Sequence, residues 1–164
     1  MTLMKISQAG LDLIKQYEGC KLYAYRDSVG VATIGYGHTK DVRMGMAITQ
    51  QQADRFLMED CATAEKTLNN LGINMKQCQF DALCSWIFNL GVGNFLHSTM
   101  LIRMQTGASD EDVTDQMVKW CNAGGKPLTW LMRRRCAEAN MFLGCKRYWV
   151  AQEKKTNTYK IVKQ

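Results

Sequence analysis

Residues 17–39, YEGCKLYAYRDSVGVATIGYGHT, gather side chains that can do acid–base chemistry. Glu18 and Asp27 are carboxylates, Thr33 carries a hydroxyl group, and His38 is one of two histidines in the chain. Two carboxylates whose surroundings favour opposite protonation states can act as a general acid and a general base. Glycoside hydrolysis needs such a pair, so the stretch predicts a candidate site for that chemistry.

A helix over residues 8–18 is predicted to place Glu18. Ser7 is a candidate N-cap and Gly19 stands where the residue after a helix would be. Apolar side chains recur at helical spacing at Leu11, Ile14 and Tyr17. The C-terminus of a helix carries partial negative charge, which disfavours an ionised carboxylate. We therefore expect Glu18 to hold a proton and to serve as an acid.

Two aromatic and β-branched runs, residues 22–27 and 31–36, predict a β-hairpin after this helix. Asp27 then lies at the turn, where it is exposed and ionised. Thr33 lies beside it on the returning strand, in position to hold a water molecule, and both face the helix end. A Glu at a helix end and an Asp in a turn are also common structural residues, so the pattern alone leaves a structural interpretation open.

The rest of the chain is predicted to be helical. Thr49 and Gln52 form a capping box for a long helix over residues 50–70. One further helix is expected to end near Gly91, and a short one to span 99–105. Another is expected to run from Ser109 to Gly124-Gly125, with a buried stripe of Val113, Met117, Trp120 and Cys121. A last one is expected to run from Thr129 to Gly144.

These elements predict an α+β fold, mostly α, built as two lobes. Residues 12–65 form a hairpin lobe that includes the start of the long linking helix. Residues 66–150, together with 1–11, form a helical lobe. Residues 151–164 form a basic tail that is either disordered or folded back.

Composition indicates one globular domain of 164 residues with 46% hydrophobic content. No apolar run reaches the roughly 18 residues of a membrane span and no signal peptide is apparent, so we expect synthesis in a cytosol and no membrane insertion. The seven cysteines show no C-x-x-C spacing and are expected to be buried, reduced thiols. A net charge of +6 suggests an anionic partner, although solubility alone would also explain it.

The spacing E-x₈-D-x₅-T, followed by TIGYGHT, closely resembles the bacteriophage lysozyme (endolysin) family of T4-like and lambdoid type, glycoside hydrolase family 24. LCSWIFNLGVG and WCNAGGKPLTWLMRRRCAEANMF are similar to two further segments of that family, and the matches together cover residues from about 5 to 145. The resemblance implies a lysozyme-like fold and a muramidase. Such an enzyme hydrolyses the β-1,4 bond between N-acetylmuramic acid and N-acetylglucosamine in peptidoglycan.

The resemblance also implies a role for each site residue by matching positions. Glu18 would give a proton to the leaving oxygen, and Asp27 would be the carboxylate on the other face of the sugar. Thr33 would help to hold the attacking water, and the family is regarded as inverting. Asn89 would face the substrate cleft, although it is also an ordinary residue near a helix end, and Arg134 would approach the catalytic glutamate.

His38 and Asp60 have a structural interpretation, and Cys20 is considered as a possible nucleophile. Asp60 falls on the apolar stripe of the long helix, where a carboxylate needs a partner, and the resemblance implies that His38 pairs with it across the lobe junction. The second histidine is distant in sequence, so we expect no metal site and no cofactor. Cys20 lies beside the proposed site but has no candidate partner histidine.

The run Arg133-Arg134-Arg135 has three possible interpretations. It can be a nucleic-acid patch, or a solvated helix face on which Arg134 and Glu138 pair at i, i+4. The resemblance adds the third, in which Arg134 supports Glu18.

The function implied is that of an endolysin that causes host cell lysis. Bacterial peptidoglycan is then the partner, and its peptide carboxylates attract a basic protein. By analogy with the family we expect a monomer that accumulates in the host cytoplasm, is released through a holin, acts on the cell wall in the periplasm and binds no nucleic acid.

Two alternatives remain. A lytic transglycosylase cuts the same bond with one glutamate, and the presence of Asp27 disfavours it. A non-catalytic basic module that binds peptidoglycan or nucleic acid would have no need of the Glu18, Asp27 and Thr33 spacing.

Overall fold

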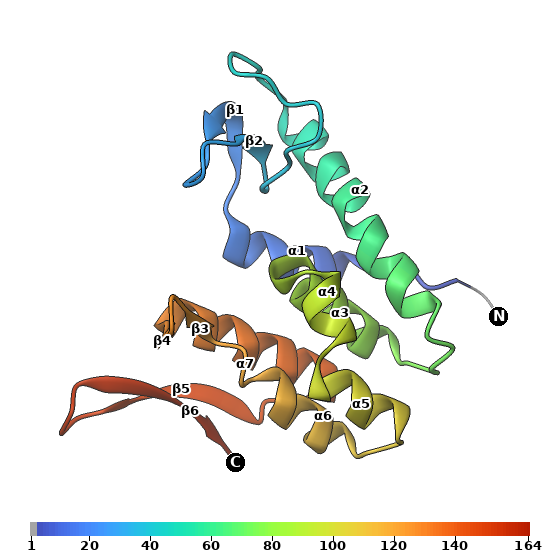
Figure 1. Cartoon of the computed structure of the whole chain (residues 1–164), viewed down its shortest axis with the longest axis vertical. Coiled ribbons are helices and arrows are strands. Elements are labelled where there is room, and N and C mark those ends of the chain that lie inside the picture. Colours follow the sequence, from blue (N-terminus) through green and yellow to red (C-terminus); the bar gives the residue numbers. More distant parts are fainter. Residues whose placement is uncertain (1–2) are drawn as a thin grey trace.

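The structure is a computed structural model that describes residues 3–164; residues 1 and 2 of the predicted 1–11 segment lie outside it. In this range the helices are α1 (Gln8–Glu18), α2 (Gln50–Asn69), α3 (Gln77–Leu90), α4 (Val92–Leu96), α5 (Thr99–Gln105), α6 (Asp110–Met117) and α7 (Thr129–Leu143). The strands pair as β1 (Lys21–Arg26) with β2 (Ala32–Gly35), β3 (Asn122–Ala123) with β4 (Lys126–Pro127), and β5 (Tyr148–Glu153) with β6 (Thr158–Lys163). The predicted class, α+β and mostly α, is confirmed (Figure 1).

Helix α1 has the predicted bounds, but Ser7 does not cap it through its side chain. The Ser7 hydroxyl donates instead to the carboxylate of Asp81 in α3, which also accepts from the Ser7 amide at 2.8 Å. Gly10 permits this contact, because a Cβ atom there would lie 2.9 Å from the Asp81 side chain. The close approach fixes α1 across α3 and so determines where Glu18 lies.

Helix α2 links the hairpin to the helical part of the molecule. Thr49 and Gln52 form the predicted capping box, in which the Gln52 amide donates to Thr49 Oγ1 at 3.1 Å and the Thr49 amide donates to Gln52 Oε1 at 2.8 Å. The helix has 20 residues, which makes it about 30 Å long. Its first half packs against β2 and its last half against α3 (Figure 1).

Two groups of buried apolar side chains hold the fold together. The smaller one joins α1, the chain after β2 and α2: Leu11, Ile14, Tyr36, Ala53, Leu57 and Cys61. The larger one surrounds α3, which packs against α1, α2, α4 and α7. Helix α2 contributes to both groups, and α1 contributes to the smaller group and packs directly on α3, so packed helices bound the space between α1, α2 and the end of α3.

The prediction of a helix from Ser109 to Gly124-Gly125 is wrong at its end. Ser109 does cap α6, but the helix ends at Met117 and a short hairpin, β3–β4, follows. Gly124 and Gly125 both have positive φ (58° and 78°), which suits the two central residues of a tight hairpin turn. Trp120 still reaches the core from outside the helix, where its ring lies edge-on to another tryptophan at 5.2 Å.

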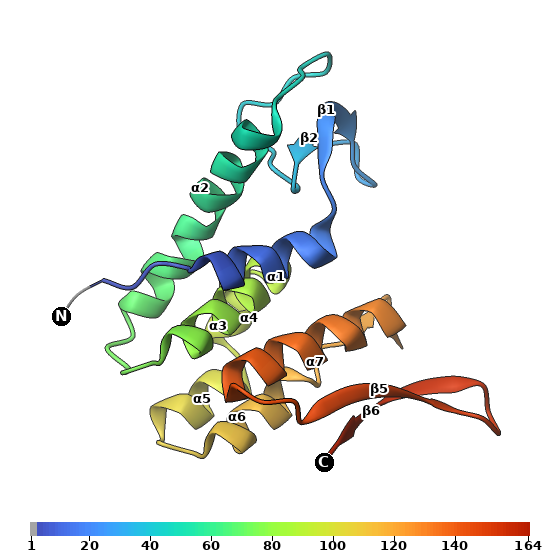
Figure 2. The same cartoon turned by 180° about the vertical axis from the view of Figure 1, so that it is seen from behind.

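The last predicted helix and the tail also differ in detail. Leu128, not Thr129, is the N-cap of α7, and its side chain makes no cap; Gly144 ends the helix in the left-handed conformation as predicted. Of the two alternatives for the tail, the structure shows a folded one. Residues 148–163 form the β5–β6 hairpin, which packs against α7 (Figure 2).

The cysteines are all free thiols, but they are not all buried. Cys61, Cys84 and Cys136 are buried, and burial raises the pKa of Cys61 and of Cys136 to about 12. Cys78 and Cys121 are only half-buried, and Cys20 and Cys145 are exposed, which corrects the prediction for these four; the two exposed thiols each lie just after a helix ends. In residues 3–164 no helix combines the length and the hydropathy that a membrane span requires.

Candidate active site

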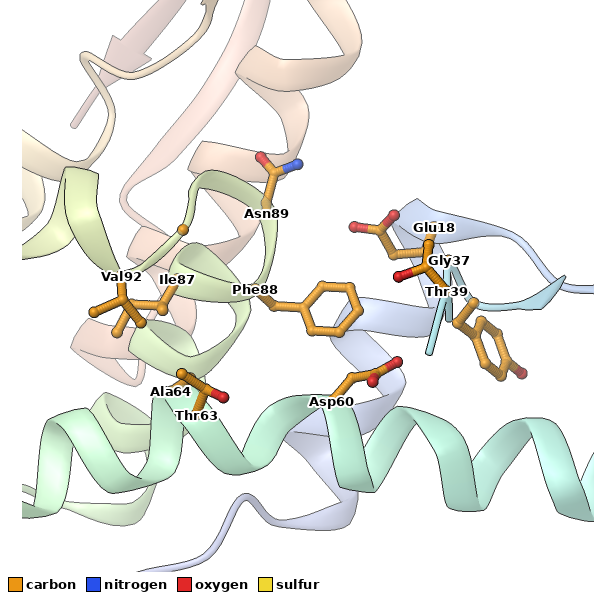
Figure 3. A pocket seen from close by; sticks show the side chains of 12 residues that line it. Glu18, Gly37, Thr39, Asp60, Thr63, Ala64, Ile87, Phe88, Asn89 and Val92 are labelled. Carbon is orange, nitrogen blue, oxygen red and sulfur yellow. The ribbon is translucent and has the colours of Figure 1, made fainter. Parts of the chain in front are cut away.

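A cleft of about 440 Å³ lies between the end of α1, the chain after β2, the middle of α2 and the end of α3. Its lining residues come from all four segments: Glu18, Tyr36, Gly37, Thr39, Asp60, Thr63, Ala64, Ile87, Phe88, Asn89, Gly91 and Val92. In Figure 3, Glu18 and Asn89 lie on two sides of the cleft. The Phe88 ring lies between these two side chains and that of Asp60. The cleft therefore combines a carboxylate and an amide with an apolar floor, which suits a polar ligand with a flat face.

Glu18 is the last residue of α1, and its side chain is 24% exposed. Gly19 follows with φ 65° and ψ 162°, a conformation open to glycine, so the chain turns at once into β1 and leaves the Glu18 carboxylate at the cleft. Glu18 Oε1 accepts a hydrogen bond from Nη1 of Arg134. The helix end alone predicts no cation beside Glu18, whereas the family resemblance implies that Arg134 approaches it, and in the structure the two side chains are in direct contact.

Arg134 is fully buried, which excludes both the nucleic-acid patch and the solvated face as descriptions of this residue. Its Nε donates to Glu138 Oε1 at 3.1 Å, and its Nη2 donates to the Ser85 carbonyl at 3.2 Å. The predicted i, i+4 pair with Glu138 is therefore present, but inside the protein. With its other nitrogens held in this way, Arg134 presents Nη1 to Glu18 in a fixed direction.

Arg135 likewise donates a hydrogen bond to a residue of the cleft, Asn89, and this contact was not predicted from the sequence. Arg135 is also fully buried, its Nη2 donates to Asn89 Oδ1, and its Nε lies 3.1 Å from Glu138 Oε2. Glu138 also accepts from the Ser85 hydroxyl at 2.7 Å. Burial raises the pKa of the Glu138 carboxyl, and the two arginines oppose that rise. A single buried carboxylate thus holds the two arginines that reach Glu18 and Asn89.

Asp27 and Thr33 lie on the β1–β2 hairpin, but they are not opposite each other. Thr33 pairs with Tyr25, and the Asp27 amide donates to the Val31 carbonyl at 3.0 Å. The prediction that Asp27 and Thr33 lie side by side is therefore wrong. The turn takes up the three residues after Asp27, so Asp27 lies opposite Val31, one cross-strand pair beyond the end of β1. Alternate residues share a face, so Asp27 and Thr33 are diagonal neighbours. Neither is among the residues that line the 440 Å³ cleft.

Each of these two side chains is held by hydrogen bonds within the hairpin. Asp27 Oδ1 accepts from the amides of Val29 (3.0 Å) and Val31 (2.8 Å), which leaves Oδ2 outside the bonds that hold the turn. Thr33 is buried, and its hydroxyl donates to the Val31 carbonyl at 2.9 Å. Its lone pairs can still accept a hydrogen bond.

His38 and Asp60 meet between the hairpin and α2. His38 Nδ1 lies 2.9 Å from both carboxylate oxygens of Asp60, and the imidazole stacks on the Phe56 ring at 4.3 Å. His38 is almost fully buried, while the Asp60 side chain is 30% exposed. The contact joins the chain after β2 to the long helix, so it fixes one wall of the cleft.

We expect Asp60→Asn to lower the free energy of unfolding by about 1–2 kcal/mol, because the buried imidazole loses a charged hydrogen-bond partner. Urea unfolding followed by circular dichroism measures the change. Asp12→Asn is a matched control, since Asp12 is exposed on α1. Equal stability of the two variants would show that the His38 contact contributes nothing.

No group of three or more His, Cys, Asp or Glu side chains in residues 3–164 is arranged to hold a metal ion. The cleft presents the carboxylates of Glu18 and Asp60 and the amide of Asn89, which can transfer protons and form hydrogen bonds.

The cleft lies where the end of α1, the chain after β2 and the helices α2 and α3 meet, in a fold that is similar to those of solved lysozymes. The model for phage lysozyme matches residues 15–138, and the chain belongs to that family. It is therefore a glycoside hydrolase, a lysozyme that lyses peptidoglycan.

Individual relatives agree with this assignment. An endolysin of Acyrthosiphon pisum secondary endosymbiont phage 1 is 42% identical over 144 residues, which are 85% of this chain and 98% of that protein. The muramidase domain of SpmX from Asticaccaulis excentricus is 38% identical with a TM-score of 0.79, over 85% of this chain and 97% of that one. A variant of P22 lysozyme is 37% identical with a TM-score of 0.80, over 85% and 99%.

Proposed function

We propose that the chain is an endolysin that hydrolyses the β-1,4 bond between N-acetylmuramic acid and N-acetylglucosamine, with Glu18 as the general acid. The observation that carries the proposal is the position of Glu18. It is a carboxylate on the cleft wall, held by an arginine that is itself fully buried. A general acid must be held in one place to protonate a leaving oxygen, and this arrangement provides that.

Asp27 is proposed as the second carboxylate and Thr33 as the residue that holds the water. The hairpin presents both on the same face, and the Val29 and Val31 amides orient Asp27. In an inverting enzyme the base activates a water on the face of the sugar opposite the acid, so the two carboxylates must be separated by more than a direct contact. Asp27 does not line the 440 Å³ cleft, so its proposed role is supported by the family motif and by the hairpin register that makes it a diagonal neighbour of Thr33.

Asn89 is proposed to bind substrate and Arg134 to support Glu18. Asn89 lines the cleft, and Arg135 takes up its amide oxygen, which leaves the amide nitrogen to donate to a sugar hydroxyl or carbonyl. We also propose that residues 12–65 and 66–150 with 1–11 act as the two lobes that enclose the glycan strand, with 151–164 as an appended segment.

The stereochemical outcome tests this mechanism directly. We expect the first product of hydrolysis to be the α-anomer, because a water activated by Asp27 attacks from the face opposite the leaving group. Proton NMR in the first moments of the reaction, before mutarotation, distinguishes the two anomers. Initial accumulation of the β-anomer would refute a direct attack by water.

Mass spectrometry of the released muropeptides separates hydrolysis from the alternative chemistry. Reducing N-acetylmuramic acid ends are expected. Anhydro-sugar ends would identify a lytic transglycosylase, which needs one glutamate and no water-activating partner. A basic module without catalytic activity would release neither product.

We propose that the endolysin is a monomer that accumulates in the host cytoplasm and reaches the cell wall after a holin opens the membrane. The wall in the periplasm is then its place of action. The support for this is the membership of the family, since its substrate lies outside the compartment in which phage proteins are made.

A further inference from the structure

The β5–β6 hairpin lies outside the residues that match the phage lysozyme family, which end at 138. In both views it extends beyond the helices, and its tip lies on the same side of the molecule as the β1–β2 hairpin (Figures 1 and 2). We call residues 145–164 the cationic arm. The mechanism proposed above uses no residue of this segment.

The cationic arm carries nearly all of the net charge of the chain. It contains six basic residues and one acidic residue, Glu153, and so has a net charge of +5. The whole chain has a net charge of +6, so the 144 residues before the arm contribute only +1. The anionic partner suggested by the composition is therefore expected to meet the arm and not the body of the enzyme.

Several of these cations are free to meet an external anion. Lys146, Lys154 and Lys155 are exposed, and within residues 3–164 no carboxylate lies within 4.0 Å of their ammonium groups. Lys163, by contrast, is paired with Asp115 of α6 at 2.8 Å and belongs to the base of the arm.

The base of the arm is firmly attached to the helices. Asn140 of α7 accepts from the amides of Arg147 and Tyr148 at 2.8 Å and donates to the Tyr148 carbonyl at 2.9 Å. The Tyr148 hydroxyl donates to Asp115 at 2.6 Å. Val150 and Ile161 pack against the main core. The hairpin that carries the free lysines is therefore attached to the helical part of the enzyme, unlike a disordered tail.

The distribution of apolar residues argues against insertion into lipid. Trp149 and Val162 are half-buried near the base, the turn from Gln152 to Thr158 is polar and exposed, and Tyr159, 39% exposed, is the single large apolar side chain beside that turn. A hairpin that enters a bilayer needs apolar residues at the part that inserts. The charge without an apolar tip favours a soluble, hydrated anionic polymer.

We propose that the cationic arm binds the peptide carboxylates of peptidoglycan and holds the enzyme on its substrate between cuts. This inference rests on the proposed function, because it takes the substrate from it. Peptide stems repeat along every glycan strand, so an anchor on their carboxylates keeps the cleft near further bonds. The effect resembles a second binding module on the same chain.

Binding to purified Gram-negative sacculi tests the proposal in the full-length Glu18→Gln background, in which the substrate is not consumed. The test variant adds Lys146→Gln, Lys154→Gln and Lys155→Gln. A matched control adds Lys66→Gln, Lys76→Gln and Arg103→Gln, three exposed cations elsewhere that change the net charge equally. We expect the test variant to bind about tenfold more weakly and the control less than about twofold more weakly.

Two changes of condition identify the interaction. We expect the difference in binding between the variants to disappear when the sacculus carboxylates are converted to neutral amides. We expect the same when about 0.5 M NaCl is added, because this salt screens charges beyond a few ångströms. Equal binding of test and control variants to native sacculi would overturn the proposal. So would a difference that persists on amidated sacculi, or one seen only with vesicles of anionic phospholipid.

Two different measurements test this inference and the proposed function, so the failure of one can be told from the failure of the other. Binding to sacculi involves no bond cleavage, whereas the role of Glu18 is read from turnover. If the arm variant in the otherwise wild-type enzyme binds weakly but gives the same product anomer, the arm inference and the mechanism both stand.

Discussion

Glu18→Gln is expected to lower lytic activity by a factor of at least about 10²–10⁴, because glutamine keeps the shape of the side chain but cannot give a proton to the leaving oxygen. Glu18 lines the cleft and is only part-exposed, and Arg134 fixes its carboxylate. The loss is therefore expected in the rate of bond cleavage and not in the fold. Clearing of chloroform-treated Gram-negative cells, followed by turbidity, measures the activity.

Glu59→Gln is the matched control for this variant. Glu59 lies on α2 with its side chain 57% exposed, and its nearest cation, Arg55, is 3.7 Å away. We expect it to have wild-type activity. If Glu18→Gln cleared cells as fast as Glu59→Gln, the general-acid role would be wrong, and a lytic effect that needs no catalysis by Glu18 would have to be sought.

Glu138→Gln is expected to have the largest effect on stability, a loss of about 3–5 kcal/mol in the free energy of unfolding. Glu138 and the arginines at 134 and 135 are all fully buried. The variant removes the one carboxylate that lies between the two guanidinium groups. The remaining nearby anion is then Glu18, which lies at the cleft. Breaking a buried ion pair is costly because the charge that stays behind has lost its compensation.

Urea unfolding at neutral pH measures this loss, again with Glu59→Gln as the control, for which we expect a change below about 0.5 kcal/mol. Glu138→Asp distinguishes charge from shape. It keeps the negative charge but shortens the side chain, so we expect it to lose less stability than Glu138→Gln. If the two Glu138 variants were equally unstable, the packing of the side chain and not its charge would be responsible.

Those elements that depend on local signals were predicted well from the sequence. The bounds of α1 and α5 agree with the prediction, and the Thr49–Gln52 capping box begins α2 as expected. Apolar periodicity and the residues at helix ends are properties of neighbouring positions, so no information from distant parts of the chain is needed.

One element, the helix after Ser109, was mispredicted and another, the tail, was left open, because in each case a local pattern had two possible structures. Val113, Met117, Trp120 and Cys121 have helical spacing, but only the first two lie in α6, and Trp120 reaches the same core from the segment that follows. In the β5–β6 hairpin the inward-facing side chains at 148, 150 and 161 are too few to give a clear period of two. Contacts with α7, far away in the printed order, decide that this segment is folded.

The secondary structure around Glu18, the class of fold and the spacing of Glu18, Asp27 and Thr33 all follow from the order of the amino acids. The burial of Arg134 and Arg135, and their position between Glu138 on one side and Glu18 and Asn89 on the other, are seen only in the folded molecule. The physical reason is that three consecutive arginines on a helix have the same local propensity whether they are solvated or buried. Their environment depends on which elements pack over each face of α7, and that is a property of the whole chain.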